Sequence, residues 1–220
     1  MRLGVLFSGG KDSTYAALRA KRQGNELACL ISVFSENKES FMFHTPAIEL
    51  VKKQAVLMEL PLIIQRTKGE KELELKDLEK VIGTAKKKYK IEGIVTGAVA
   101  SVYQASRIQK IFDKLGLECF NPLWRKDQIE LLNELLKNKF DVMIVGAFAY
   151  PLDKSWIGRK IDSNFIEDVK EMQEKYEINP AGEGGELETL VVDCPLFKEK
   201  LQVRIKSISG EGNSWVAELE

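Results

Sequence analysis

The chain has 220 residues, enough for one large domain or two small ones with a buried core. It carries 33 Lys and Arg residues against 33 Asp and Glu residues, so its formal net charge is zero. Nucleic-acid binders usually carry a basic excess, and we therefore expect no nucleic-acid partner. No apolar run reaches the ~20 residues of a membrane-crossing helix, and no basic stretch precedes a long apolar core at the start. We expect a cytoplasmic protein with no membrane partner; the sequence leaves open a homo-oligomer.

The three cysteines, Cys29, Cys119 and Cys194, lie far apart in the sequence and form no Cys-x-x-Cys pair. This spacing argues against a disulfide framework and against a cysteine-rich metal site. We expect reduced cysteines that are packed within strands.

The first half of the chain alternates apolar strands with amphipathic helices. Short apolar runs predict strands at residues 3–7, 27–34, 62–65, 91–96 and 117–120. Helical patterns are found at about residues 11–23, after Thr45-Pro46, along the apolar stripe of residues 75–89, and at about residues 103–115. This order predicts an α/β fold with a parallel, Rossmann-like sheet that has helices on both faces.

The pattern changes after Asn121-Pro122-Leu123-Trp124. Helices are expected at about residues 128–138 and 164–175, and strands at residues 141–148, 187–192, 201–208 and 215–219. The last two strands would be joined by a turn at Gly210–Asn213. We therefore expect a first domain of residues 1–123 and a smaller, β-rich α+β domain of residues 124–220.

The segment Ser8-Gly9-Gly10-Lys11-Asp12-Ser13 stands between the first predicted strand and the first predicted helix. Adjacent glycines allow a sharp turn and close approach of a ligand, and the free N–H groups of a helix start suit phosphate. The two serine hydroxyls can donate hydrogen bonds, and the lysine adds a positive charge. The aspartate can hold the loop by accepting backbone N–H bonds, or it can help to bind Mg²⁺. The spacing differs from the Walker A pattern, which needs four residues between its first glycine and the Gly-Lys pair.

This hexapeptide resembles the PP-loop of the N-type ATP pyrophosphatases, which share the adenine nucleotide alpha hydrolase-like fold. That superfamily includes GMP synthetase, asparagine synthetase, argininosuccinate synthetase and tRNA-thiolating enzymes, which attach AMP to a substrate oxygen and release pyrophosphate. The resemblance implies that ATP and Mg²⁺ are the cofactors and that the loop grips the pyrophosphate portion. It implies that Lys11 and Asp12 are catalytic, with Asp12 as the metal ligand. Its adenine site would lie around Val33 and Phe34.

Further residues belong to the predicted nucleotide pocket. His44, the only histidine, is expected beside the carboxyl-terminal edge of the second strand, and Gly97 ends the fourth strand. Parallel sheets bind ligands at this edge. With the hexapeptide, the set of cofactor-binding candidates is Ser8, Gly9, Gly10, Lys11, Asp12, Ser13, Val33, Phe34, His44 and Gly97.

Three further segments narrow the choice of family: Ser40–Thr45, Gly97–Arg107 and Gly182–Thr189. Together with Pro122-Leu123-Trp124, they resemble the diphthine–ammonia ligase (diphthamide synthase) family over essentially the whole chain. The resemblance implies amidation of diphthine on elongation factor 2 by free ammonia, through an acyl-adenylate, with release of AMP and pyrophosphate. Residues 1–123 would be the PP-loop ATP-binding domain, and residues 124–220 the substrate-binding domain.

The same segments supply the substrate-binding candidates. Arg107 lies on the same helix face as Gln104 and could meet a phosphate or a carboxylate. Diphthine carries a quaternary ammonium in the family's chemistry, which Glu183 or Glu186 and an aromatic side chain such as Tyr103 or Trp124 could receive. Glu186 is also a catalytic candidate. The full set is Ser101, Tyr103, Gln104, Arg107, Trp124, Glu183, Gly184, Gly185, Glu186 and Glu188.

Other interpretations stay open. His44 could cap a helix, Ser101–Arg107 could decorate one, Gly182–Glu188 could be a turn, and Trp124 could be a core residue. A tRNA thiolase would share the loop, but three isolated cysteines provide no paired thiols. A glutamine-dependent amidotransferase would need a glutaminase domain or an N-terminal nucleophilic cysteine, whereas this chain begins Met1-Arg2-Leu3. Another PP-loop ligase, acting on a small molecule or tRNA, and a non-catalytic ATP-binding module are the alternatives.

Overall fold

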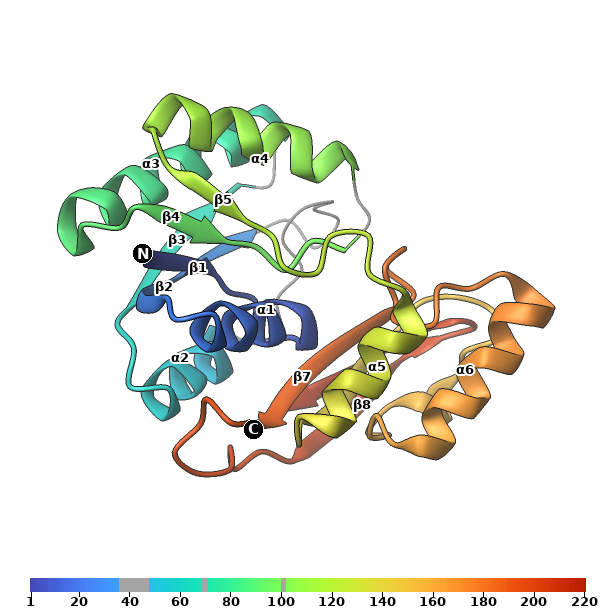
Figure 1. Cartoon of the computed structure of the whole chain (residues 1–220). Coiled ribbons are helices and arrows are strands. Elements are labelled where there is room, and N and C mark those ends of the chain that lie inside the picture. The colour runs from blue at the N-terminus through green and yellow to red at the C-terminus, as the bar shows by residue number, and fades with distance from the viewer. Residues whose placement is uncertain (36–47, 69–70, 100–101) are drawn as a thin grey trace. The chain divides into compact units, whose positions relative to one another are not determined.

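A computed structural model describes residues 1–35, 48–68, 71–99 and 102–220 of the chain (Figure 1). The chain forms two compact units, Met1–Trp124 (unit 1) and Arg125–Glu220 (unit 2). Among the described residues, no helix is both long enough and apolar enough to cross a membrane.

Unit 1 is built on a five-stranded parallel sheet with the order β3-β2-β1-β4-β5. The strands are β1 (Arg2–Leu6), β2 (Glu26–Ser35), β3 (Leu62–Thr67), β4 (Gly93–Val95) and β5 (Glu118–Phe120). Helices α1 (Lys11–Arg22) and α2 (Ile48–Leu57) lie on one face of the sheet, and α3 (Lys71–Tyr89) and α4 (Val102–Leu115) lie on the other (Figure 1). The predicted Rossmann-like sheet is confirmed.

The strand order reverses beside β1, and this places the start of α1 at a functional position. The chain runs outward from β1 through β2 to β3, then returns to β4 on the opposite side of β1. In open parallel sheets, ligands bind at the carboxyl ends of the strands where the order reverses. The β1–α1 junction lies at this edge.

The core of unit 1 follows from the sequence pattern. Leu78, Ile82 and Ala85 recur at helical spacing along α3, and all three are fully buried. They pack in one cluster with Ile31 of β2 and Ile94 of β4. Full burial of a Leu or Ile side chain contributes about 1.5–3 kcal/mol, so the helix docks by this stripe while its charged face stays in water.

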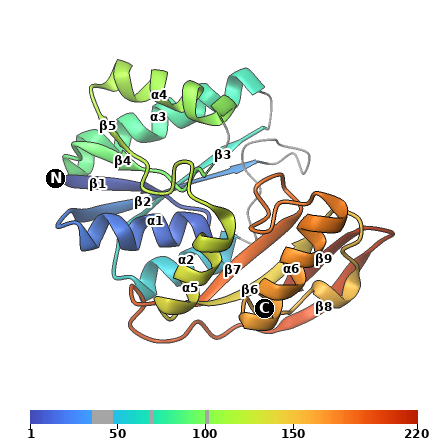
Figure 2. The same cartoon turned by 45° about the vertical axis from the view of Figure 1, so that its right-hand side comes forward.

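Unit 2 contains a four-stranded antiparallel sheet with the order β7-β6-β9-β8. Its elements are α5 (Gln128–Lys137), β6 (Asp141–Ala147), the 3₁₀ turn η1 (Lys154–Trp156), α6 (Ser163–Tyr176), β7 (Leu187–Asp193), β8 (Ile205–Glu211) and β9 (Ser214–Leu219). Helices α5 and α6 lie on the same face of the sheet (Figure 2). The predicted β-rich α+β class is confirmed.

The sequence interpretation of the last hairpin was wrong in its details. Residues 201–204 precede β8 instead of belonging to it, and β8 continues through the first two residues of the predicted turn, to Glu211. Gly210 pairs directly with Trp215, and a Cβ at position 210 would lie only 2.0 Å from the carbonyl oxygen of Ser214. Gly210 is therefore required by close strand pairing, and the turn is confined to Gly212 and Asn213.

A charge cluster lies at the start of β6. The carboxylate of Asp141 accepts hydrogen bonds from Lys160 at 2.8 Å and from Lys200 at 2.7 Å. Burial acts to raise the pKa of Asp141, but the two ammonium groups outweigh it, and the pKa is lowered. The cluster ties the segment before β8 to β6.

Candidate functional site

The PP-loop segment (residues 8–13) joins β1 to α1 at the carboxyl edge of the parallel sheet. Gly10 is the N-cap residue of α1 and has an extended backbone, with φ −82° and ψ 174°. Since glycine has no side chain, it cannot satisfy the N–H groups of the first helical turn. Those donors and the positive end of the helix dipole make this junction suited to an anion.

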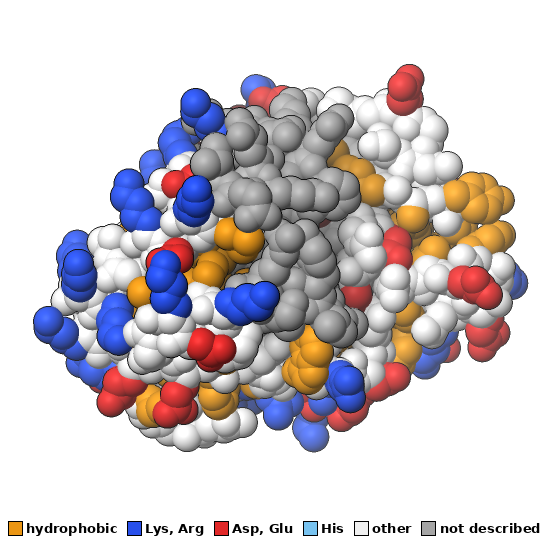
Figure 3. Space-filling model, turned by 90° about the horizontal axis from the view of Figure 1, so that it is seen from above, with side chains coloured by type: hydrophobic (Ala, Val, Ile, Leu, Met, Phe, Trp, Pro, Cys, Tyr) orange, Lys and Arg blue, Asp and Glu red, His pale blue; other side chains and the backbone are white. Residues whose placement is uncertain are grey.

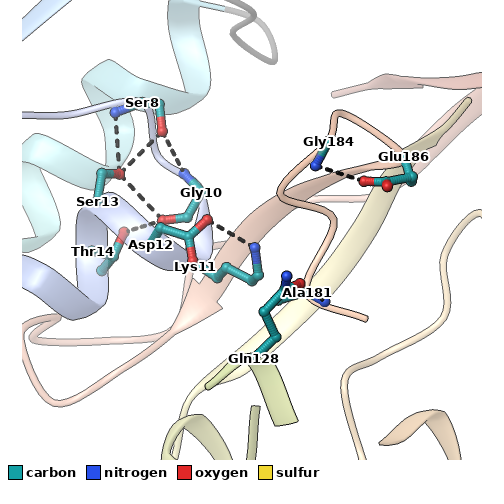
Figure 4. Close-up of polar contacts among 10 residues, drawn as sticks. All are labelled: Ser8, Gly10, Lys11, Asp12, Ser13, Thr14, Gln128, Ala181, Gly184 and Glu186. Atoms are coloured by element: carbon teal, nitrogen blue, oxygen red, sulfur yellow. Dashed lines mark hydrogen bonds and ion pairs between the residues drawn. The ribbon is translucent and has the colours of Figure 1, made fainter. Parts of the chain in front are cut away.

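Hydroxyl groups hold the turn closed (Figure 4). The hydroxyl oxygens of Ser8 and Ser13 lie 3.1 Å apart, and the backbone N–H of Ser8 donates to Ser13 Oγ at 3.2 Å. The hydroxyl of Thr14 donates to the carbonyl of Gly10 at 2.8 Å. The two predicted serines thus hydrogen-bond to each other across the loop.

Lys11 and Asp12 form a partly buried ion pair at the start of α1. The ammonium of Lys11 lies 2.8 Å from Asp12 Oδ2, and Lys11 is only 3% exposed. The other carboxylate oxygen, Asp12 Oδ1, is buried and has no hydrogen-bond partner in the part of the chain that the structure describes. An orphaned carboxylate oxygen fits a divalent cation, and Mg²⁺ is commonly held by one or two carboxylates plus substrate phosphates.

Gly9 is shaped by a residue that the sequence analysis missed. Its φ is +82°, and a Cβ there would lie 2.3 Å from Oε1 of Gln54. Gln54 belongs to α2, is fully buried, and donates from Nε2 to the carbonyl of Gly9 at 3.0 Å. The available signal was a polar residue among the apolar positions 51, 55 and 58 of that helix.

Gly97, a predicted nucleotide-pocket residue, packs against the PP-loop segment. A Cβ at position 97 would lie 2.7 Å from the carbonyl carbon of Asp12 and 2.7 Å from the nitrogen of Ser13. The chain after β4 therefore passes directly against the first turn of α1. Val33 and Phe34 lie near the carboxyl end of β2, the strand next to β1.

Several candidates cannot be placed by their side chains. His44 and Ser101 lie outside the described residues. Tyr103, Gln104 and Arg107 belong to the first turns of α4, where the backbone alone is described. Trp124, half-buried, is the last residue of unit 1.

The acidic loop (residues 182–186) leads into β7, and Glu186 binds its own loop. Glu186 Oε1 accepts hydrogen bonds from the backbone N–H of Asn179 at 3.1 Å and from Asn179 Nδ2 at 2.6 Å. Glu186 Oε2 accepts from the backbone N–H of Gly184 at 2.8 Å (Figure 4). The structure thus places both oxygens of this predicted catalytic and substrate-binding residue against the loop.

Two amide side chains extend this network, and the sequence analysis missed both. Nε2 of Gln128, at the start of α5, donates to Asn179 Oδ1 at 3.0 Å. Gln128 Oε1 accepts from the backbone N–H of Ala181 at 3.0 Å (Figure 4). The loop is therefore tied to α5 as well as to Glu186.

The other acidic-loop candidates are arranged around this network. Gly185 has a φ of +88°, which favours glycine, and a Cβ on Gly184 would lie 2.7 Å from Glu186 Oε1. Glu183 is half-buried, and Glu188 is in β7 opposite Gly146. The backbone conformation thus favours glycine at position 185, and Gly184 lies close against the Glu186 carboxylate.

The three cysteines are free thiols. Burial raises the pKa of Cys29 and of Cys194 to about 12. Cys119 is exposed by its surface area, and partial desolvation of its thiol still raises the pKa. Thiolate is the reactive form, so the two buried thiols are poor nucleophiles at neutral pH.

A surface hollow of about 520 Å³ lies along α3 and the end of α4. Its charged lining residues are Lys76, Glu79, Lys80, Lys87 and Lys114. None of the predicted site residues lines it. On the face that Figure 3 shows, Lys and Arg side chains gather toward the left, interspersed with Asp and Glu side chains.

A glycine-rich loop before the first helix of a parallel sheet, at the point where the strand order reverses, defines a nucleotide-binding α/β protein. Residues 1–119 match the family model of the diphthamide synthase N-terminal domain, and residues 127–218 match that of the diphthamide synthase C-terminal domain. The chain therefore belongs to the diphthamide synthase family. The predicted family and the predicted class, an ATP-dependent ligase, are confirmed.

Curated relatives share this assignment. The diphthine–ammonia ligase of Rattus norvegicus is 31% identical, and that of Homo sapiens is 32% identical; each match covers 92% of this chain and 83% of the relative. The diphthine–ammonia ligase of Schizosaccharomyces pombe is 29% identical over 94% of this chain, which spans 37% of that relative. A solved structure from Methanocaldococcus jannaschii is described as a predicted subunit of tRNA methyltransferase. The match covers 91% of this chain and 100% of that chain, at 17% identity. The TM-score of this match is 0.42.

Proposed function

We propose that this protein amidates diphthine on elongation factor 2, using ATP and ammonia and releasing AMP and pyrophosphate. The observation that carries the proposal is the match of both family domains, in order, over nearly the whole chain. The PP-loop segment supports it, because its helix start and buried lysine suit the phosphates of ATP.

The nucleotide is assigned to unit 1. Gly9 and Gly10 let the backbone approach the phosphates, and the N–H groups of the first turn of α1 donate to them. The buried ammonium of Lys11 supplies positive charge to the pyrophosphate portion. Val33 and Phe34 are assigned to the adenine.

Mg²⁺ is assigned to Asp12, whose Oδ1 lacks a partner among the described residues. When bound, the ion offsets negative charge on the departing pyrophosphate. Lys11 has a role separate from that of the metal ion, because its ammonium group neutralises the other carboxylate oxygen of Asp12, Oδ2, at 2.8 Å. The pair thus combines one buried carboxylate oxygen that has no partner among the described residues with one buried ammonium group.

The reaction has two balanced steps. A carboxylate oxygen of diphthine attacks the α-phosphorus of ATP, and the bond to pyrophosphate breaks. The nitrogen of ammonia then attacks the acyl carbon, loses a proton, and displaces AMP to leave the amide. Adenylation is needed because a free carboxylate has a poor leaving group; AMP is a good one.

Substrate recognition is assigned to the second set of candidates: Ser101, Tyr103, Gln104, Arg107, Trp124 and the acidic loop. The quaternary ammonium of diphthine favours carboxylate and aromatic neighbours. Glu186 is engaged by three donors of its own region.

Labelled ATP tests the proposed reaction type. We expect AMP and pyrophosphate in equal amounts, formed only when diphthine-bearing factor and ammonium are both present. ADP and phosphate as products would overturn the proposal. Turnover that needs tRNA or a small carboxylic acid instead of the factor would favour another PP-loop ligase. Tight ATP binding without any turnover would favour a non-catalytic module.

A further inference from the structure

We infer that Gln128 and Asn179 are positioning residues that, with Glu186, fix the conformation of the acidic loop. In this assignment Glu186 acts through the loop and does not contact the substrate. The inference rests on the proposed function in one respect, since it takes the acidic loop to be part of the substrate site. The hydrogen-bond network itself stands on the geometry of unit 2.

The first step is that both carboxylate oxygens of Glu186 accept hydrogen bonds from its own region of the chain. Oε1 accepts from the backbone N–H and the Nδ2 group of Asn179, and Oε2 accepts from the N–H of Gly184. Hydrogen bonds to an ionised carboxylate are shorter and stronger than neutral ones. The carboxylate therefore closes the segment from Asn179 to Glu186 into a ring.

The second step is that the carboxylate determines the orientation of both amides. A carboxylate only accepts, so Asn179 must direct Nδ2 toward Glu186 and Oδ1 away from it. Gln128 must then offer Nε2 to Asn179 Oδ1, which leaves its Oε1 for the N–H of Ala181. Every donor in this series of hydrogen bonds meets an acceptor only in this one arrangement of the two amide groups.

The third step is steric. A Cβ on Gly184 would lie 2.7 Å from Glu186 Oε1 and 2.9 Å from Asn179 Nδ2. A Cβ on Gly182, where φ is +74°, would lie 2.9 Å from Cβ of Leu187. The loop backbone thus folds closely over the network, and we expect a change in the network to move the loop.

Two roles for Glu186 make different predictions at Gln128. If Glu186 contacts the substrate directly, a change at Gln128, which reaches it only through Asn179, should have little effect. If Glu186 holds the loop, Gln128→Glu should impair amide formation as a change at Glu186 does, because it places an acceptor against Asn179 Oδ1. Glu186→Gln should also disrupt the loop, since its amide group meets an N–H donor at one of the two oxygen positions.

The test combines kinetics with residue-resolved hydrogen exchange on the full-length protein. In Gln128→Glu we expect exchange at the N–H groups of Asn179, Ala181 and Gly184 to rise about tenfold, and kcat for amide formation to fall about tenfold. KM for ATP should stay unchanged, because the nucleotide is assigned to unit 1. Gln173→Glu is the matched control: Gln173 is exposed on α6, and the same substitution there should change neither readout.

Gln128→Met, which keeps the length of the side chain but removes donor and acceptor, is the second variant if Gln128→Glu does not fold. Wild-type exchange and wild-type kcat in a folded Gln128 variant would overturn the inference. A wild-type protein that forms no amide would refute the proposed function, whereas the exchange rates would still decide whether the network holds the loop.

Discussion

Gly97 provides a sharp test of how the PP-loop segment is supported. A Cβ at this position would lie 2.7 Å from two backbone atoms, the carbonyl carbon of Asp12 and the nitrogen of Ser13. Real Cβ atoms essentially never come closer than 3.0 Å to a heavy atom of a residue that is not their chain neighbour, and backbone atoms cannot rotate away as a side chain can. Gly97→Ala must therefore displace either the chain after β4 or the first turn of α1.

The size of the effect follows from the cost of overpacking. Inserting one carbon into a well-packed site costs about 1–3 kcal/mol. If the displacement falls on the first turn of α1, the phosphate-binding N–H groups move with it. At ~1.4 kcal/mol for each factor of ten, ATP affinity should weaken roughly 5- to 150-fold.

The assay is calorimetric titration with ATP and Mg²⁺, together with KM for ATP. Gly83→Ala is the control, because a Cβ at this position in α3 meets only Leu115 Cδ2 at 4.0 Å. Alanine is favoured over glycine in a helix by about 0.5–1 kcal/mol, so this variant should be slightly more stable and bind ATP normally. Wild-type ATP affinity in Gly97→Ala, or equal weakening in both variants, would refute the reasoning.

Other predictions concern charge and thiol chemistry. Lys11→Ala removes the buried ammonium of the PP-loop segment, and we expect AMP formation to fall by about 100- to 1,000-fold; unchanged turnover would exclude the assigned role. Because burial raises the pKa of Cys29 and Cys194 to about 12, a thiol reagent at pH 8 should label Cys119 first in the native protein and all three cysteines after unfolding. Rapid labelling of either buried thiol in the native protein would contradict this prediction. The lowered pKa of Asp141 favours the ionised, folded form, so its contribution to stability is present above the ordinary Asp value of about 3.9 and is lost as pH falls through the lower folded value. The two lysine partners are half-exposed, so Asp141→Asn should reduce the free energy of unfolding at pH 7 by only about 0.5–1 kcal/mol. The variant's free energy of unfolding should also depend less on pH in the acid range. An identical acid dependence in variant and wild type would argue against a stabilising role of the Asp141 carboxylate.

The sequence was sufficient where the structure depends on local pattern. Buried parallel strands appear as continuous apolar runs, and the glycines and the lysine of the PP-loop segment are adjacent in the chain. The order of elements in unit 1 and the place of this loop could therefore be predicted. Gly210 misled the interpretation of β8, because a glycine required by close strand pairing has the same appearance in a sequence as a glycine in a turn.

The supporting amides could not be predicted in this way. Gln54 reaches Gly9 across 45 positions, and Gln128 reaches Asn179 across 51. A single glutamine carries no periodic signal, and its partner is defined only once the chain is folded. The carboxylate of Glu186 illustrates the same limit, since a sequence shows a charge but not the N–H groups that the folded loop turns toward it.

The central claim is that the chain converts a carboxylate on its protein substrate into an amide. The direct measurement is mass analysis of diphthine-bearing elongation factor 2 after incubation with this protein, ATP, Mg²⁺ and ammonium. We predict the mass change of a carboxylate-to-amide conversion at the diphthine residue, dependent on both ATP and ammonium and matched by the amount of AMP released. An unmodified factor, in the presence of protein that demonstrably binds ATP, would contradict the claim.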